Sequence, residues 1–188
     1  MDPRVRAAMG AAPRSAFLPD NLRDLWRLDR PLPLSHGQTN SQPSTVVAML
    51  ELLDVQPGMK VLDVGSGSGW TTALLAELVG PQGRVIGVER VPQLVAGGCR
   101  ALESGSWPWA EIRQATAGTL GAPADAPFDR ILVSAEADSL PRALVDQLAD
   151  GGVMVVPVAG VMTRVVRAGG DQLVTRHGFY VFVPLIED

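Results

Sequence analysis

Beyond residue 59 the chain alternates between short apolar runs and longer segments in which apolar residues recur every three or four positions. Short apolar runs are typical of buried strands, and the longer period is typical of amphipathic helices. The pattern predicts strands at residues 59–64, 84–89, 110–115, 128–134 and 152–157, with helices at 70–79, 92–103 and 141–148. Strands that alternate with helices form βαβ units, so we expect a doubly wound, mostly parallel α/β sheet.

The C-terminal part of the chain has no helical period. Residues 163–168 and 179–185 have strand-like patterns on either side of a turn at 169–171. An antiparallel edge is common on a mostly parallel sheet. The complete prediction is therefore a seven-stranded sheet with an antiparallel C-terminal edge.

The N-terminal part is less regular. Residues 1–30 predict short helical pieces that are interrupted by prolines, and the polar stretch 31–43 predicts a loop. A helix is expected at residues 43–53, with Pro43 in its first turn and either Ser41 or Asn40 as its N-cap.

Length and composition favour one globular domain. A chain of 188 residues fits a single domain, and 46% hydrophobic with 19% charged residues excludes a disordered chain. We expect residues 1–45 to form a cap on a core at 46–188. The net charge of −4 provides no basic field for nucleic acid, and the single Cys99 can form neither an internal disulfide nor a cysteine zinc site.

No targeting or membrane segment is expected. The chain begins with a charged stretch that no apolar run follows, which does not fit a secretory signal. No apolar stretch approaches the ~18 residues of a membrane span. We therefore expect a cytoplasmic protein without membrane contact.

The most informative stretch is the glycine-rich sequence at residues 61–70. It lies between a predicted strand and a predicted helix, where the carboxyl edge of a doubly wound sheet forms a ligand crevice. Glu89 ends the next strand, and a carboxylate there can accept hydrogen bonds from both hydroxyls of a ribose. Together these features predict a cofactor that contains a nucleoside.

The spacing of the glycines decides between cofactors. A dinucleotide fingerprint has glycine at its sixth position, where this chain has Trp70, and no Gly-Lys-Ser/Thr follows for a Walker loop. S-adenosylmethionine has no phosphate groups and needs only close backbone approach and a ribose acid. It is therefore the favoured cofactor, while a dinucleotide or a glycine turn without a ligand stays an alternative.

The chain resembles the protein-L-isoaspartate (D-aspartate) O-methyltransferases over nearly its whole length. The loop at residues 30–43, RPLPLSHGQTNSQP, carries the resemblance most specifically, because the glycine motif is shared by many methyltransferases. Residues 4–18, 61–70, 126–135 and 182–185 also fit the family.

The resemblance implies a class I S-adenosylmethionine-dependent methyltransferase fold, with the N-terminal cap on the substrate side. It also implies transfer of a methyl group to the carboxylate of isoaspartyl residues in damaged proteins or peptides. The ester then closes to a succinimide, whose hydrolysis returns some normal aspartate. A carboxylate is already ionised at pH 7, so the reaction requires no general base, and the sequence contains no evident catalytic triad or metal-ligand cluster.

The resemblance also assigns site residues. Ser41 is the catalytic hydroxyl, which would orient the carboxylate, and it shares the substrate site with His36, Thr39 and Asn40. The residues implied at the cofactor are Thr39, Asp63, Gly65, Ser66, Gly67, Gly69, Glu89, Arg90, Ala117 and Gly118. Two structural alternatives stay open: Ser41 as a helix N-cap, and His36 as the donor or acceptor of a structural hydrogen bond.

Three positions depart from the family pattern. Asn40 replaces the usual Ile and would add hydrogen-bonding capacity to the pocket; Ala117 replaces an acidic residue in the turn that meets adenine. Glu136 adds a negative charge near the expected substrate mouth. These departures motivate two alternatives: a methyltransferase redirected to another peptide or small molecule, and a cofactor-binding relative without catalysis.

Overall fold

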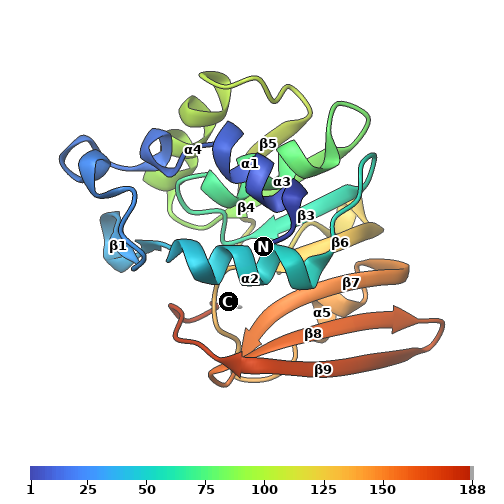
Figure 1. The fold of residues 1–188 in the computed structure, drawn as a ribbon. Helices are drawn as coiled ribbons and strands as arrows, with labels where there is room; N and C mark the ends of the chain where they lie inside the picture. The colour runs from blue at the N-terminus through green and yellow to red at the C-terminus, as the bar shows by residue number, and fades with distance from the viewer. Residues whose placement is uncertain (187–188) are drawn as a thin grey trace.

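In residues 1–186, which the computed structural model describes, seven strands form the central sheet in the order β5-β4-β3-β6-β7-β8-β9 (Figure 1). The strands from β5 to β7 run parallel, whereas β8 and β9 are antiparallel to their neighbours. This arrangement confirms the mostly parallel sheet with its antiparallel C-terminal edge. The strands are β3 (Lys60–Val64), β4 (Arg84–Glu89), β5 (Ala110–Gln114), β6 (Phe128–Val133), β7 (Leu148–Val158), β8 (Val161–Ala168) and β9 (Asp171–Phe179).

Two apolar layers cover the two faces of the sheet. Alternate residues of a strand point to opposite faces, so Val61 packs in one layer and Leu62 in the other. The first layer joins the sheet to the long helices, and the second joins it to α5 and the loop before β6. The helices are α1 (Pro3–Ala11), α2 (Pro43–Leu53), α3 (Trp70–Val79), α4 (Pro92–Glu103) and α5 (Arg142–Val145).

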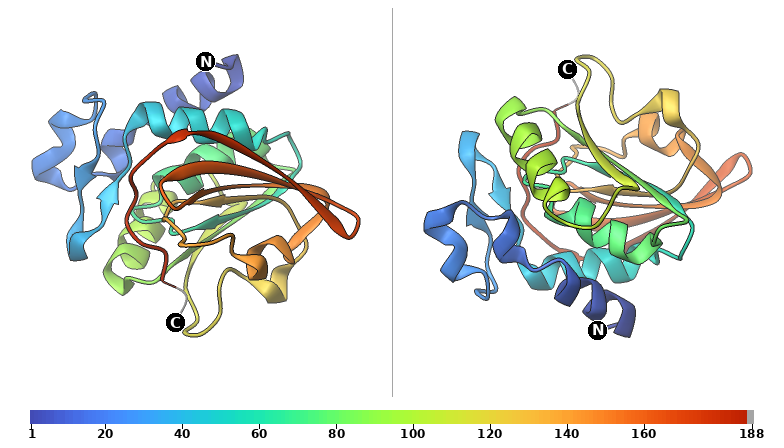
Figure 2. Two further views of the ribbon diagram at one scale, coloured as in Figure 1. Left: turned by 90° about the horizontal axis from the view of Figure 1, so that it is seen from below. Right: turned by 90° about the horizontal axis from the view of Figure 1, so that it is seen from above.

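The segment between α1 and α2 lies at one side of the sheet, as both views of Figure 2 show. It contains two short 3₁₀ helices, η1 (Arg14–Phe17) and η2 (Asp20–Leu25). Strands β1 (Leu32–Pro33) and β2 (Thr39–Asn40) then form an antiparallel pair around η3 (Ser35–Gly37). Part of the predicted loop 31–43 is therefore a small hairpin.

Two predictions from the sequence are wrong: the position of the last strand and the length of the last helix. The last strand is β9 at 171–179 and not 179–185, because the chain turns back directly after Gly169 and Gly170 and pairs Asp171 with Ala168. β9 is an edge strand that carries mainly exposed and polar residues, so no apolar run marks it. The helix predicted at 141–148 is only the four residues of α5, because Leu148 already pairs with Phe128 in the sheet.

The predicted cap of α2 is also wrong. Gln42 occupies the N-cap position without a side-chain cap hydrogen bond, and Pro43 begins the helix. The amide of Ser44 instead donates to Oδ1 of Asp29 at 2.9 Å, and this hydrogen bond is the main cause of the lowered pKa of Asp29. A carboxylate from a distant part of the chain thus satisfies this end of the helix, and Ser41 is left out of the cap.

No helix among residues 1–186 is long and apolar enough to cross a membrane.

Candidate active site

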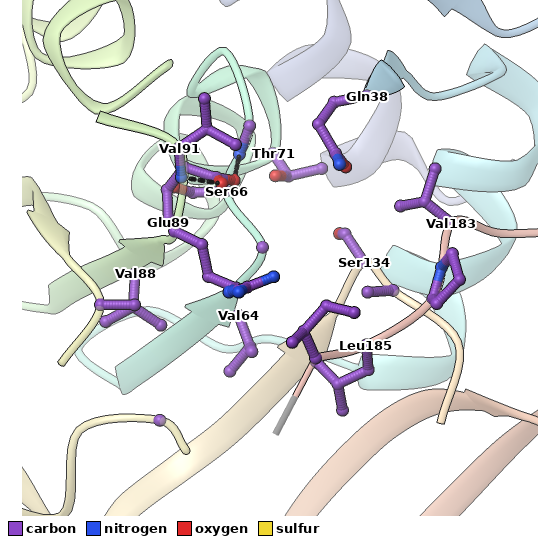
Figure 3. A pocket seen from close by; sticks show the side chains of 18 of the residues that line it. Gln38, Val64, Ser66, Thr71, Val88, Glu89, Val91, Ser134, Val183 and Leu185 are labelled. Carbon is purple, nitrogen blue, oxygen red and sulfur yellow. Dashed lines mark hydrogen bonds between the residues drawn. The ribbon is translucent and has the colours of Figure 1, made fainter. Parts of the chain in front are cut away.

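A cavity of about 290 Å³ lies at the carboxyl ends of β3, β4 and β6 (Figure 3). The sheet order places β3 between β4 and β6, so the chain leaves β3 toward one side of the sheet and later returns on its other side. Such a switch point is where doubly wound folds bind their ligands. The wall is completed by the loop before α2, the loop after β5, and the C-terminal segment at 183–186.

The glycine loop between β3 and α3 forms the floor of the cavity. Gly65, Gly67 and Gly69 all have positive φ angles, of 76°, 55° and 88°. A Cβ on Gly69 would lie 2.9 Å from Cδ1 of Ile112 and 3.3 Å from Cα of Gly98, so α4 can approach only a glycine there. A Cβ on Gly67 would meet no atom closer than 3.9 Å, which leaves its cavity side open to a ligand.

Glu89 holds the glycine loop in place. Its side chain ends β4 and is buried, with Oε2 accepting from the amide of Gly67 and Oε1 from the amide of Val91, both at 2.9 Å. Each carboxylate oxygen has a second acceptor position, so the group can still receive hydrogen bonds from a diol. The sequence predicted the ribose acid, and the structure adds that the same carboxylate orders the loop.

Asp63 supports the loop from behind and does not line the cavity. Its carboxylate is fully buried, and Oδ2 accepts from the hydroxyls of Thr71 and Thr72, each at 2.7 Å, while Oδ1 has no hydrogen-bond partner among residues 1–186. Burial disfavours the charged form and, with a smaller contribution from Glu89, raises the pKa of Asp63 to about 6. The implied direct contact of Asp63 with a cofactor is therefore corrected to a supporting role.

The loop before α2 brings Gln38, Thr39 and Ser41 to the cavity wall. Ser41 is half-buried, and its backbone carbonyl accepts from Nη2 of Arg14 at 2.8 Å. The sequence analysis did not single out Gln38, although this polar side chain stands next to the residues that it did select. His36 is exposed with φ at 58° and lies outside the cavity wall, so its implied substrate contact is not supported by its position.

Asn40 also contributes to the cavity wall, and its amide makes hydrogen bonds within the protein. The residue is 4% exposed, its Oδ1 accepts from Nε of Arg14 at 2.6 Å, and its Nδ2 donates to Oγ of Ser68 at 3.0 Å. Both ends of the amide are thus engaged within the protein.

The far end of the cavity contains the remaining implied cofactor residues. Arg90, Ala117 and Ser66 contribute to the wall, whereas Gly118 has φ at 69° and stays outside it. The methyl group of Ala117 provides no side-chain acceptor for a ligand base.

Ser134 and residues 183–186 also line the cavity, which the sequence did not predict. Figure 3 shows Ser134 between Gln38 and Leu185. Glu136 explains this closure, because its amide donates to the carbonyl of Val183 at 2.8 Å and its carbonyl accepts from the amide of Leu185 at 2.7 Å. Residues 182–185 carry part of the family resemblance, but their tertiary position depends on this pairing with the loop after β6.

The fold and the cavity define the chain as a class I S-adenosylmethionine-dependent methyltransferase. The model of the protein-L-isoaspartate (D-aspartate) O-methyltransferase family matches residues 1–188. The chain belongs to this family, and the predicted resemblance is confirmed.

Individual relatives agree with the family match. The chain is 46% identical over 185 residues to the protein-L-isoaspartate O-methyltransferase of Methanothrix thermoacetophila, covering 97% of this chain and 88% of that protein. It is 45% identical to the enzyme of that name from Methanopyrus kandleri, covering 97% and 83%. The crystal structure of a β-aspartate methyltransferase from Plasmodium falciparum, in complex with S-adenosyl-L-homocysteine, matches with a TM-score of 0.89 at 27% identity, covering 100% and 92%.

The buried Asp63 predicts a specific dependence of stability on pH. Its folded pKa of about 6 lies above the unfolded value of 3.8, so the folded state binds the proton more tightly. The protonated group stabilises the folded state below pH 4. As the pH rises to about 6 this stabilisation is lost, and the unfolding free energy falls by roughly 3 kcal/mol. We expect the unfolding free energy of Asp63→Asn relative to wild type to increase by about 2–3 kcal/mol between pH 4 and pH 7 in urea titrations.

Asp138→Asn, which removes an exposed carboxylate, is the control and should follow wild type within about 0.5 kcal/mol. Parallel curves for wild type and Asp63→Asn would contradict the pH prediction.

Proposed function

We propose that this protein transfers the methyl group of S-adenosylmethionine to the carboxylate of L-isoaspartyl residues in damaged proteins or peptides. One observation carries the proposal. The glycine loop, which Glu89 orders, and the hydroxyl side chains of Thr39 and Ser41 line the same cavity. Membership of the family supports the same class of enzyme and the same cofactor.

The cofactor end of the cavity fits S-adenosylmethionine. Gly67 leaves open the volume that a Cβ would fill, and Glu89 keeps acceptor positions for the two ribose hydroxyls. Val64 and Val88 add apolar surface beside these groups. When bound, the cofactor supplies an electrophilic methyl group on a sulfonium centre.

The opposite end of the cavity suits an ionised carboxylate. The hydroxyls of Thr39 and Ser41 are donors that can orient its oxygens, while Val183 and Leu185 add apolar surface to the wall. Because the nucleophile is already charged at pH 7, the residues of this chain only need to align and desolvate it. No group of three or more metal-ligating side chains occurs in residues 1–186, and this chemistry requires none.

The alternative of a redirected substrate was motivated partly by Asn40. Both polar ends of this side chain bind other residues of the chain, which gives Asn40 a structural role at the cavity wall. Glu136 contributes backbone hydrogen bonds that hold residues 183–185. The departure at Asn40 therefore has a structural explanation, and the isoaspartyl substrate stays the proposal.

A methyl-transfer assay tests the proposal directly. With radiolabelled S-adenosylmethionine, we expect wild type to methylate a peptide that contains one L-isoaspartyl residue, and to methylate its aspartyl twin at least about 100-fold more slowly. This ratio corresponds to roughly 2.7 kcal/mol of differential transition-state stabilisation, because the free carboxylate of the aspartyl twin lies on a longer arm, with a methylene group between it and the main chain. Equal rates, or no transfer to either peptide, would refute the isoaspartyl substrate.

The role of Glu89 can be tested by binding alone. Glu89→Ala removes the ribose acceptor and the acceptor of the Gly67 amide, so we expect the affinity for S-adenosylhomocysteine to fall by about 1.5–3 kcal/mol, or roughly 10- to 150-fold, in calorimetric titrations. Glu103→Ala removes an exposed carboxylate of α4 and should bind normally. Unchanged affinity in a folded Glu89→Ala variant would remove Glu89 from the cofactor site.

The role of Ser41 is separable from helix stability. Because Ser41 does not cap α2, Ser41→Ala should change the unfolding free energy by less than about 0.5 kcal/mol. We expect it to lower kcat/KM for the isoaspartyl peptide by about 10- to 150-fold, as for a lost hydrogen bond to a charged group. Ser44→Ala is the matched control on the same segment and should retain the wild-type rate. A loss of about 1 kcal/mol of stability with an intact rate would instead identify a cap.

A further inference from the structure

Asn40 connects the loop that carries Thr39 and Ser41 to the glycine loop. Its Oδ1 faces Nε of Arg14 at 2.6 Å, and its Nδ2 faces Oγ of Ser68 at 3.0 Å. An arginine can only donate, so the oxygen of the amide must face Arg14 and the nitrogen must face Ser68. The orientation of the amide is therefore determined by the chemistry of its two partners.

Arg14 gives this connection a rigid support. Its guanidinium is buried, lies 5.4 Å from the ring centre of Trp70, and donates to five acceptors. These acceptors are Oδ1 of Asn40 and the backbone carbonyls of Leu28, Arg30, Asn40 and Ser41, at 2.6 to 3.0 Å. The backbone on both sides of the Asn40–Ser41 peptide is thus held by the same group that holds the Asn40 amide.

Ser68 lies at the other end of the connection. It stands between Gly67 and Gly69, two residues with positive φ, and it lines the cavity. The amide of Gly67, one residue before it, donates to Glu89. A displacement of the glycine loop on cofactor binding would therefore be transmitted through Ser68 and Asn40 to the segment that presents Ser41.

We propose that Asn40 is a positioning residue that couples the two halves of the cavity, so that occupation of the cofactor site strengthens binding of the substrate carboxylate. The carboxylate part rests on the proposed function, whereas the connection between the loops does not. By reciprocity, the peptide must raise the affinity for the cofactor by the same factor. Coupling between two sites is commonly about fivefold or more.

Calorimetric titration measures this factor. S-adenosylhomocysteine is titrated with and without saturating isoaspartyl peptide, a pair that cannot react. In wild type, we expect the peptide to raise the affinity for S-adenosylhomocysteine about fivefold or more. In Asn40→Ile and Ser68→Ala, the peptide should raise this affinity less than about twofold. Ser68→Ala removes only the glycine-loop half of the connection and leaves Arg14 fully bonded, so it keeps the test valid should Asn40→Ile fold poorly.

Two further variants separate coupling from stability. Asn40→Asp keeps an acceptor for Arg14 and can accept from the Ser68 hydroxyl, so it should restore the wild-type factor. Gln42→Leu removes another amide of the same loop, whose Nε2 donates to Asp29 and Ser44, and should leave the coupling factor unchanged. If Asn40 has only a structural role, the melting temperature of Asn40→Ile will fall, but the coupling factor will be the same in wild type and in all four variants. That result would overturn the proposal. A factor near one in wild type would overturn it as well.

Amide hydrogen exchange distinguishes failure of this proposal from failure of the proposed function. If wild type does not methylate the isoaspartyl peptide, saturating S-adenosylhomocysteine alone should still slow exchange at residues 38–41 in wild type and Gln42→Leu. This protection should be at least about threefold weaker in Ser68→Ala. Equal protection in Ser68→Ala would show that the ligand orders the segment without the connection, and the proposal would then be wrong.

Discussion

The structure depends on the buried guanidinium of Arg14. Burial lowers its pKa to about 10, which still leaves it charged at pH 7, and four backbone carbonyls with one amide oxygen satisfy it in place of a carboxylate. A buried charge is tolerated only when its donors are matched in this way. The N-terminal segment must therefore fold around Arg14, and this arrangement places Ser41 over the cavity.

A second constraint acts at the end of β4. The two oxygens of Glu89 accept from Gly67 and Val91, so the carboxylate that would bind the ribose also orders the glycine loop and the start of α4. Asp63 acts from below through Thr71 and Thr72. Of these two carboxylates, Glu89 therefore lines the cavity, and Asp63 supports its floor.

Reaction chemistry explains why so few groups in the cavity are charged. Methyl transfer to an ionised carboxylate needs alignment and exclusion of water, and it needs no proton transfer. The walls combine hydroxyl donors such as Thr39 and Ser41 with apolar residues such as Val183 and Leu185. The last two reach the cavity because Glu136 pairs with their backbone, although they lie about 50 residues further along the chain.

The sequence by itself determined the features that depend on local pattern and backbone chemistry. Apolar runs between helical segments specify the parallel strands, and the glycine spacing specifies the loop at the cavity floor, because its positive φ angles favour glycine. Only the tertiary structure decided what depends on distant partners. It removed Asp63 from the cavity wall and gave Asn40 a partner at each end. It also supplied Asp29 in place of Ser41 at the start of α2, since hydrogen-bond partners remote in the chain leave no local pattern.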